Sequence, residues 1–316
     1  MPPITSIQSL LGALAASAML VLPAAAQAPA KTPIRSAYIP AATWLPAWVA
    51  KDTGIFDRHG LDVSLTVIQN IGLLPATVGK QFDIAPATPP DLINAAAKGL
   101  NVVGVAGGWI EAGAHRSVEI MVRKDSGIKG PQDLKGKLVA AVALGSLIHV
   151  STLYWLKQNG VDPNSVRAVE VPFPNMPDQL KAGRLDAVEV IEPFVTPLLA
   201  AGNVSIGDPI LSIADPTHGT MWIAEADWAR AHPEILKAWI ASLTEGAAFI
   251  KTNPEPSRAI LGKYTRLPEP VVKTIPIPEY DAVLEPKSLE PWIKVLTELG
   301  QVTKPMNAAD LVVKAP

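Results

Sequence analysis

Short apolar runs alternate along the chain with stretches whose apolar residues recur at helical spacing. Residues 61–68 show the strand signal clearly, because Val63, Leu65 and Val67 fall on one face and polar residues on the other. In its first part the chain predicts strands at 34–39, 61–68, 82–85 and 101–106, and helices at 46–51, 74–79 and 92–98. This alternation predicts an α/β unit of parallel strands joined by right-handed crossovers.

A second unit of the same kind follows, and the pattern then changes to helices. Its predicted strands are 118–122, 138–142, 166–171 and 186–191, and its predicted helices are 147–158, 177–181 and 197–201. After a strand-like segment at 221–224 come helical stretches at 225–231, 233–251, 255–263 and 288–300. These late helices must cover an apolar surface, and the economical arrangement returns them to the first unit.

Such a return requires the chain to cross between the two units twice, near 118–124 and near 213–223. We therefore expect two lobes, with residues 32–120 and 221–316 in lobe 1 and residues 121–220 in lobe 2. Each lobe would contain a doubly wound sheet, and the two crossings would form a hinge. The cleft between the lobes would lie at the carboxyl ends of the strands, where open α/β sheets bind ligands.

The turn between residues 138–142 and 147–158 is the strongest candidate for a binding site. An apolar strand ends in Leu144, Gly145 and Ser146, and an amphipathic helix starts at Leu147. Ser146 is a suitable N-cap residue, and the free N–H groups and dipole of a helix start favour a carboxylate, sulfonate or phosphate. The alternative is a capped crossover helix that binds nothing.

Composition and motifs exclude several classes of protein. The formal net charge of -2 and the scattered basic residues argue against nucleic-acid binding or an anionic membrane surface. Cysteine is absent, which excludes zinc-thiolate sites, thiol catalysis and disulfide frameworks. The five histidines have no metal-ligand spacing, and no catalytic or nucleotide-binding motif occurs. We therefore expect a binding protein without a metal or cofactor, and not an enzyme.

The N-terminus has the features of an export signal. Residues 7–22 are apolar and rich in small side chains, and Pro23 to Ala26 supply an A-x-A-like site, although the n-region lacks Lys and Arg. We expect residues 1–26 to be a signal peptide cleaved after Ala26, which would place the mature chain in the periplasm. The alternative is an uncleaved membrane anchor, for which the run is short.

Several phrases, in this order, resemble one family of transport proteins. They are Trp48–Phe56, Ile128–Lys137, Gly145–His149, Ala182–Ala187 and Ile191–Phe194. Together they resemble the periplasmic substrate-binding proteins of ABC importers, in the NMT1/THI5-like branch that includes nitrate-, sulfonate- and taurine-binding proteins. The resemblance implies the two-lobed type II periplasmic-binding-protein fold. It also implies a receptor that closes on a small molecule and delivers it to a permease with its ATPase.

The candidate ligand-binding residues lie on loops after strands, at the crossings or in the phrases shared with the family. They are Thr43, Trp44, Thr88, Trp109, Gly145, Ser146, Leu147, His149, Phe173, Glu192, Phe194 and His218. The position of Trp44 suits either a wall on which a ligand stacks or a cover over the local core. Thr88 could either donate its hydroxyl to a ligand or belong to a plain turn. His149 has an alternative structural role, and the family phrase favours a ligand contact. Glu192 would oppose an anion unless it pairs with a cation or a protonated group.

The chemical class of the ligand is the least determined feature. Trp44, Trp109 and Trp222 fall near predicted loops or crossings, which favours a small organic anion with a flat apolar part, a sulfonate or a carboxylate. The same fold also hosts a fungal pyrimidine-precursor synthase that uses pyridoxal phosphate and carries a cysteine-rich motif, which this chain lacks. A pyrimidine-precursor binding protein and an exported sensor are further alternatives. The mature chain is expected to be a monomer that does not insert into a membrane.

Overall fold

The computed structural model describes Met1 and residues 30–313. The chain divides into residues 1–30 and 31–316, and the second unit contains all the helices and strands that are described. The expected signal peptide and its cleavage site after Ala26 lie outside the described residues. Within the described part, no helix is both long and apolar enough to cross a bilayer.

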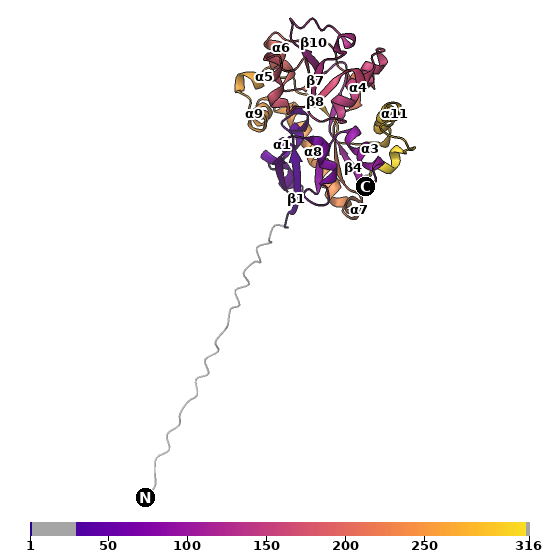
Figure 1. Ribbon diagram of the computed structural model, residues 1–316. Coiled ribbons are helices and arrows are strands. Elements are labelled where there is room, and N and C mark those ends of the chain that lie inside the picture. Colours follow the sequence, from indigo (N-terminus) through magenta and orange to yellow (C-terminus); the bar gives the residue numbers. More distant parts are fainter. Residues whose placement is uncertain (2–29, 314–316) are drawn as a thin grey trace. The chain divides into compact units, whose positions relative to one another are not determined.

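One half of the second unit, called lobe 1 from here on, is built around two small sheets (Figure 1). The first pairs β1 (Thr32–Tyr38) in parallel with β2 (Leu61–Val67). The second has the order β3 (Ile84–Ala87), β12 (Met221–Glu225), β4 (Val102–Gly107), and β12 is antiparallel to both neighbours. β1 and β2 are parallel as expected, and β3 and β4 run in the same direction because both oppose β12. β12 was not expected in this sheet; it returns late from the other half and enters between them in the opposite direction.

Lobe 2 is built around one five-stranded sheet. Its order is β10 (Val204–Ser205), β6 (Val118–Val122), β9 (Ala187–Ile191), β7 (Leu138–Ala141), β8 (Arg167–Glu170). β7 is parallel to β8 and β9, whereas β6 is antiparallel to β9. Because β6 pairs with β9, residues 118–120 belong to this sheet, although the sequence assigned them to lobe 1. The remaining lobe boundaries stay predictions.

A third sheet joins the two lobes. It has the order β11 (Thr217–His218), β5 (Trp109–Glu111), β13 (Glu279–Tyr280), with antiparallel neighbours. The two expected crossings are therefore paired with each other, and the first lies earlier in the chain than predicted. A Cβ atom at Gly219 would lie 1.9 Å from Cζ3 of Trp109, so only glycine fits beside this ring.

The helices pack as the amphipathic pattern predicts. α1 (Leu45–Asp52) packs against α8 (Pro233–Thr252) and α9 (Pro254–Thr265), and Trp48 stacks on Tyr264 with ring centroids 4.9 Å apart. The late helices thus cover lobe 1. The other helices are α2 (Ile55–Arg58), α3 (Pro89–Ala97), α4 (Leu147–Gln158), α5 (Met176–Lys181), α6 (Val195–Ala200), α7 (Ala226–Ala231), α10 (Glu269–Val272) and α11 (Glu290–Glu298).

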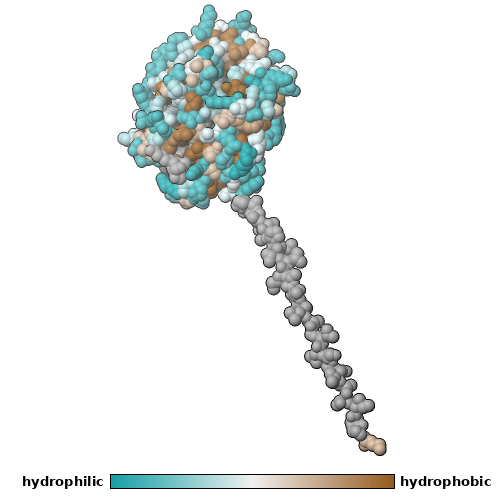
Figure 2. Space-filling model, turned by 180° about the vertical axis from the view of Figure 1, so that it is seen from behind, coloured by the Kyte–Doolittle hydropathy of each residue, from teal (hydrophilic) through white to brown (hydrophobic). Residues whose placement is uncertain are grey.

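Eight short 3-10 helices complete the loops of the described chain. They are η1 (Ala42–Trp44), η2 (Ile71–Ala76), η3 (Pro131–Leu134), η4 (Pro163–Ser165), η5 (Phe173–Asn175), η6 (Ile210–Ser212), η7 (Pro286–Leu289) and η8 (Ala308–Leu311). On the face seen in Figure 2, hydrophobic residues form small patches separated by hydrophilic ones. Apolar surface of this kind is ordinary for a folded protein.

Glu189 is an unusual member of the lobe 2 core. It lies in β9, it is 1% exposed, and neither carboxyl oxygen has a hydrogen-bond partner among the described residues. Burial raises the pKa of this carboxyl from 4.5 to about 8. An acid whose folded pKa is raised adds stability below its unfolded pKa, and this contribution is lost as pH rises through the folded value.

We expect Glu189→Gln to flatten the pH dependence of folding stability. The wild type should lose on the order of 2 kcal/mol more than the variant between pH 5 and pH 7, because the amide does not ionise. Urea unfolding at pH 5, 7 and 9 would measure this difference. Glu234→Gln, at an exposed position, is the matched control. Parallel curves for wild type and Glu189→Gln would contradict the prediction.

Candidate functional site

A small cavity lies between the two lobes. Its volume is about 40 Å³, and it is lined from both sides of the cleft. From lobe 1 and the hinge come Ile39, Ala41, Thr43, Trp44, Ile71, Thr88 and Thr220, and from lobe 2 come Val142, Ser146, Leu147, Ile148, Phe173 and Ile191. Six of the residues selected from the sequence thus meet at one place: Thr43, Trp44, Thr88, Ser146, Leu147 and Phe173.

The local structure explains why these side chains converge. Thr43 and Trp44 belong to η1, which follows β1, and Thr88 connects β3 to α3. Ser146 and Leu147 start α4 after β7, and Phe173 starts η5 after β8. Each segment follows the carboxyl end of a strand, the edge at which open α/β sheets place their ligand-binding loops.

Thr88, Asp91 and Ser146 form a polar centre that connects the lobes. Asp91 Oδ2 accepts hydrogen bonds from Thr88 N at 3.0 Å, Thr88 Oγ1 at 2.6 Å and Ser146 Oγ at 3.0 Å. The two hydroxyl oxygens are 3.2 Å apart. Burial raises the pKa of Asp91 to about 6, against the opposing effect of these hydrogen bonds. The start of α4 therefore faces a carboxyl group of this chain.

The turn before α4 differs from the prediction in one respect. Ser146 occupies the N-cap position with an extended backbone, but its side chain makes no cap hydrogen bond and donates to Asp91 instead. Gly145 has a φ of 80°, in the left-handed region that favours glycine, and its N–H donates to His149 Nδ1 at 3.0 Å. Burial lowers the pKa of His149 to about 4, so the ring is neutral near pH 7.

Aromatic rings support two walls of the cavity. Trp44 meets Trp222 edge to face, with ring centroids 5.2 Å apart, and Trp222 continues into the lobe 1 core through Trp239. Phe173 stacks on Phe194, with centroids 5.8 Å apart. Trp44 therefore combines both of its predicted roles, since it lines the cavity and packs on the core.

Six of the selected residues do not line the cavity. Gly145 and His149 belong to the turn and first turn of α4 described above, and Trp109, Glu192, Phe194 and His218 lie in the hinge or behind the walls. Trp109 is fully buried in the hinge, and its backbone N–H donates to Thr220 Oγ1 at 2.8 Å. Glu192 accepts a bond from Thr196 Oγ1 at 2.6 Å, and burial raises the pKa of its carboxyl. His218 is buried in β11, where burial lowers its pKa.

Comparison with known proteins assigns the family. The NMT1/THI5-like family profile matches residues 42–257, which is more than half of the chain. The chain belongs to the NMT1/THI5-like family. The recognition made from the sequence phrases is thereby confirmed.

Two relatives of this NMT1/THI5-like chain are named as binding proteins. It is 27% identical over 188 residues to a putative aliphatic sulfonates-binding protein of Escherichia coli, covering 58% of this chain and 55% of that protein. It is 31% identical over 140 residues to the taurine-binding periplasmic protein of E. coli, covering 44% and 42%. These alignments therefore span about half of the length of each relative.

Solved structures confirm the two-lobed fold. The alkanesulfonate-binding protein SsuA from Xanthomonas axonopodis pv. citri, bound to MOPS, superposes with a TM-score of 0.76 at 18% identity and covers 90% of this chain and 99% of that one. At this identity the likeness concerns the fold alone. The expected α/β periplasmic-binding-protein fold, with two sheet-based lobes and a hinge, is confirmed.

The lining of the cleft in this NMT1/THI5-like chain contains no Lys or Arg. Favourable potential for an anion must therefore come from the start of α4 and from the hydroxyl groups. Arg116 and Arg123, the arginines near the first crossing, are engaged elsewhere. Arg116 lies 3.6 Å from Glu119, and Arg123 donates to the carbonyls of Leu180 and Leu185. Among the residues described, no group of His, Asp and Glu side chains is arranged to hold a metal ion.

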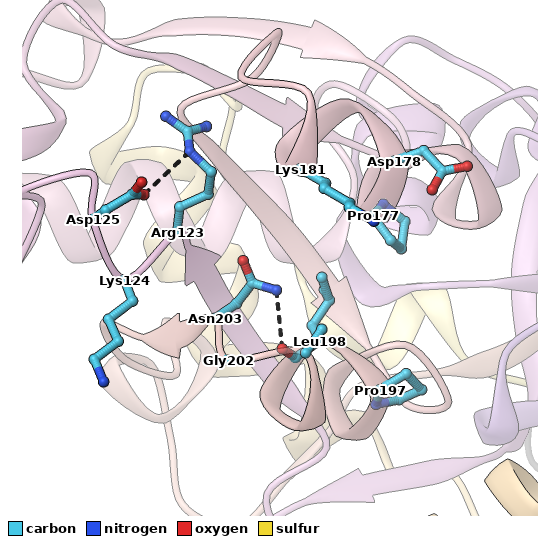
Figure 3. A pocket seen from close by; sticks show the side chains of 11 residues that line it. Arg123, Lys124, Asp125, Pro177, Asp178, Lys181, Pro197, Leu198, Gly202 and Asn203 are labelled. Atoms are coloured by element: carbon cyan, nitrogen blue, oxygen red, sulfur yellow. Dashed lines mark hydrogen bonds and ion pairs between the residues drawn. The ribbon is translucent and has the colours of Figure 1, made fainter.

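A larger hollow lies on lobe 2, away from the cleft. It has a volume of about 750 Å³ and is bordered by α5, α6 and the end of β6 (Figure 3). The salt bridge from Arg123 to Asp125 and the bond from Asn203 to the Leu198 carbonyl stabilise its rim. All of its lining residues belong to lobe 2. A molecule bound there would not contact lobe 1, so it could not favour closure of the lobes by direct contact.

Sequence reasoning did not select Asp91, which directly precedes the helix expected at 92–98. In the structure Thr88 is the N-cap residue and Asp91 is the third residue of α3, the arrangement of a capping box. The spacing Thr88-x-x-Asp91 carries this signal, because an acidic side chain three residues after a Thr can return to its backbone N–H. Its contact with Ser146 depends on the tertiary fold and has no local signal.

Proposed function

We propose that this protein is the solute-binding receptor of an ABC-type importer, exported to the periplasm, that closes its lobes on a small organic anion and delivers it to a membrane permease. The observation that carries the proposal is the cavity lined by both lobes at the start of α4. A ligand held there contacts both lobes only in the closed state, so its binding energy favours closure. The names of the binding-protein relatives support the same class.

Direct contacts between the lobes support a closing motion. Ala42 N donates to the carbonyl of Glu192 at 3.0 Å, and Asn70 Nδ2 donates to Glu170 Oε2 at 3.2 Å. These contacts and the Thr88–Ser146 approach all bridge lobe 1 and lobe 2. The cavity of about 40 Å³ is much smaller than the few hundred cubic ångströms that organic ligands commonly occupy. Ligand entry therefore requires the lobes to separate.

The ligand class follows from the lining. Thr43, Thr88 and Ser146 offer hydroxyl donors beside the α4 start, where negative charge is favoured. Trp44 and Phe173 supply apolar walls for an organic body, which suits an alkyl or aryl sulfonate or a carboxylate. Leu147 would contact the ligand beside Ser146. Gly145 and His149 would hold the turn, and the remaining selected residues would position the walls and the hinge.

Small-angle scattering combined with thermal shift tests the proposal. Methanesulfonate, benzenesulfonate, benzoate, nitrate and a pyrimidine would each be added to the mature protein at pH 6. At least one organic anion should reduce the radius of gyration and raise the melting temperature, because it binds only the native closed form. Potassium chloride at equal ionic strength is the control. If no organic anion changes either quantity, or if a neutral pyrimidine alone does, the proposed ligand class is wrong.

A further inference from the structure

Asp91 is the one ionisable side chain in the polar centre of the cleft. It is 7% exposed, and its Oδ2 accepts all three of its hydrogen bonds, from Thr88 N, Thr88 Oγ1 and Ser146 Oγ. Two of these donors, Thr88 Oγ1 and Ser146 Oγ, line the cavity. In the closed form the donors suited to an anion are therefore already engaged by a carboxyl group of the protein itself.

No positive side chain offsets this carboxyl group. α3 packs against α4, α11, β4, η2 and η8, and β4 and η2 contain no ionisable residue. The ionisable groups on the other three are His149, Tyr154 and Lys157 on α4, Glu290, Lys294 and Glu298 on α11, and Asp310 on η8. Among the described residues none of these forms a hydrogen bond or salt bridge with Asp91, and Lys157 is engaged by the Glu298 carbonyl at 2.8 Å.

An anion placed beside Ser146 would thus meet Asp91 in a buried, uncompensated site. Two negative charges in contact repel strongly at a partly buried site, because the effective dielectric constant there is far below that of water. A proton on Asp91 removes this repulsion. It also turns the carboxyl group into a donor, which releases the Ser146 or Thr88 hydroxyl to face the ligand.

We propose that Asp91 is a specificity-determining residue that takes up one proton from solvent when an anion binds, so that anion and proton enter the cleft together. This inference rests on the proposed function and adds to it a rule for the ligand. The anion of a strong acid binds only when Asp91 carries a proton. A ligand with a cationic group would instead pair with the ionised carboxylate and need no proton.

Benzenesulfonate is the suitable probe, because it stays ionised throughout the range tested. Isothermal calorimetry with the mature wild-type protein should show the dissociation constant increasing about 100-fold from pH 5 to pH 8, since uptake of one proton costs tenfold in affinity per pH unit above the free pKa. Burial raises that pKa to about 6, which places the change within the tested range. Titrations in buffers of different ionisation enthalpy should give close to one proton bound per anion near pH 7.

Asp91→Asn is the decisive variant, because its amide imitates the protonated carboxyl group at the same size. It should bind benzenesulfonate with an affinity that changes less than about threefold from pH 5 to pH 8. The proton count on wild type keeps the test valid if this variant fails to fold. Glu234→Gln, at an exposed position on α8, is the control: its affinity should keep the pH dependence of wild type.

The outcomes separate this inference from the proposed function. If wild type binds benzenesulfonate equally at pH 5 and pH 8 without proton uptake, the inference is overturned and the receptor function remains. Affinity that increases with pH would likewise overturn it, by showing that an ionised Asp91 favours the ligand. If neither wild type at pH 5 nor Asp91→Asn binds the probe, the inference is overturned, and the scattering and thermal-shift screen with the other organic anions decides the proposed function separately.

Discussion

Replacing Glu111 with alanine should lower the free energy of unfolding by roughly 3–5 kcal/mol, the range for removing one partner of a buried polar pair. Glu111 is completely buried in β5, where it accepts bonds from Ser117 N at 2.9 Å and Val118 N at 3.3 Å. Burial and the neighbouring Asp208 raise the pKa of Glu111, which favours a protonated carboxyl group beside Asp208. Alanine would leave two backbone N–H groups unpaired next to the hinge, and it would remove the protonated neighbour of Asp208, whose Oδ1 accepts from Ile210 N at 2.8 Å.

Glu111→Gln is the matched control for this prediction. The glutamine carbonyl can accept from Ser117 N, and its amide can donate toward Asp208, whose Oδ2 has no hydrogen-bond partner among the described residues. We expect this variant to lie within about 1 kcal/mol of wild type at pH 7, as for a hydrogen bond that is replaced in kind. Urea unfolding would measure both variants. Equal losses of stability for alanine and glutamine would contradict the prediction, because they would show that hydrogen bonds from this side chain do not account for its stabilising effect.

Replacing Ser146 with aspartate should weaken anion binding about 100-fold or more. The new carboxylate would lie beside Asp91, and it would repel a ligand anion at the start of α4. The helix itself should persist, because aspartate is among the best N-cap residues. Calorimetry with benzenesulfonate at pH 6 would measure the loss, and circular dichroism would confirm that the helix content is unchanged.

Ser146→Asn isolates the effect of charge in this experiment. Asparagine has the size of aspartate and caps helices equally well, but it is neutral. We expect it to lose at most about tenfold in affinity, which reflects the altered hydrogen bond to Asp91. If both variants bind equally weakly, crowding rather than charge explains the loss of affinity. The start of α4 would then not be an anion-binding site.

Local sequence patterns predicted the longer elements well. The helix expected at 147–158 is α4 (Leu147–Gln158), because its amphipathic period, its N-cap residue and Gly160 all agree. β5 was missed because three residues carry no local signal. Its pairing partners are β11 and β13, more than a hundred residues later in the chain. The direction of β12 was missed for a related reason, since sequence periodicity does not encode strand direction.

The cleft was predicted in outline and less well in detail. The rule that ligands lie after strand ends found Thr43, Thr88, Ser146 and Phe173, all of which line the cavity. The same rule selected Trp109, but this residue begins the hinge strand β5, and its ring packs beside Gly219 instead of lining the cavity. The partners of these polar side chains come from the opposite lobe, and only the folded chain brings them together.

The position of β12 between β3 and β4 has a consequence for the order in which the protein takes shape. The strands of lobe 2 all lie between residues 118 and 205, so its sheet can assemble from one continuous piece. β3 and β4 both pair with β12, which comprises residues 221–225. Until β12 has been synthesised, each of these two strands has an open edge that can pair with another chain. The last third of the polypeptide therefore determines when the first third is protected against aggregation.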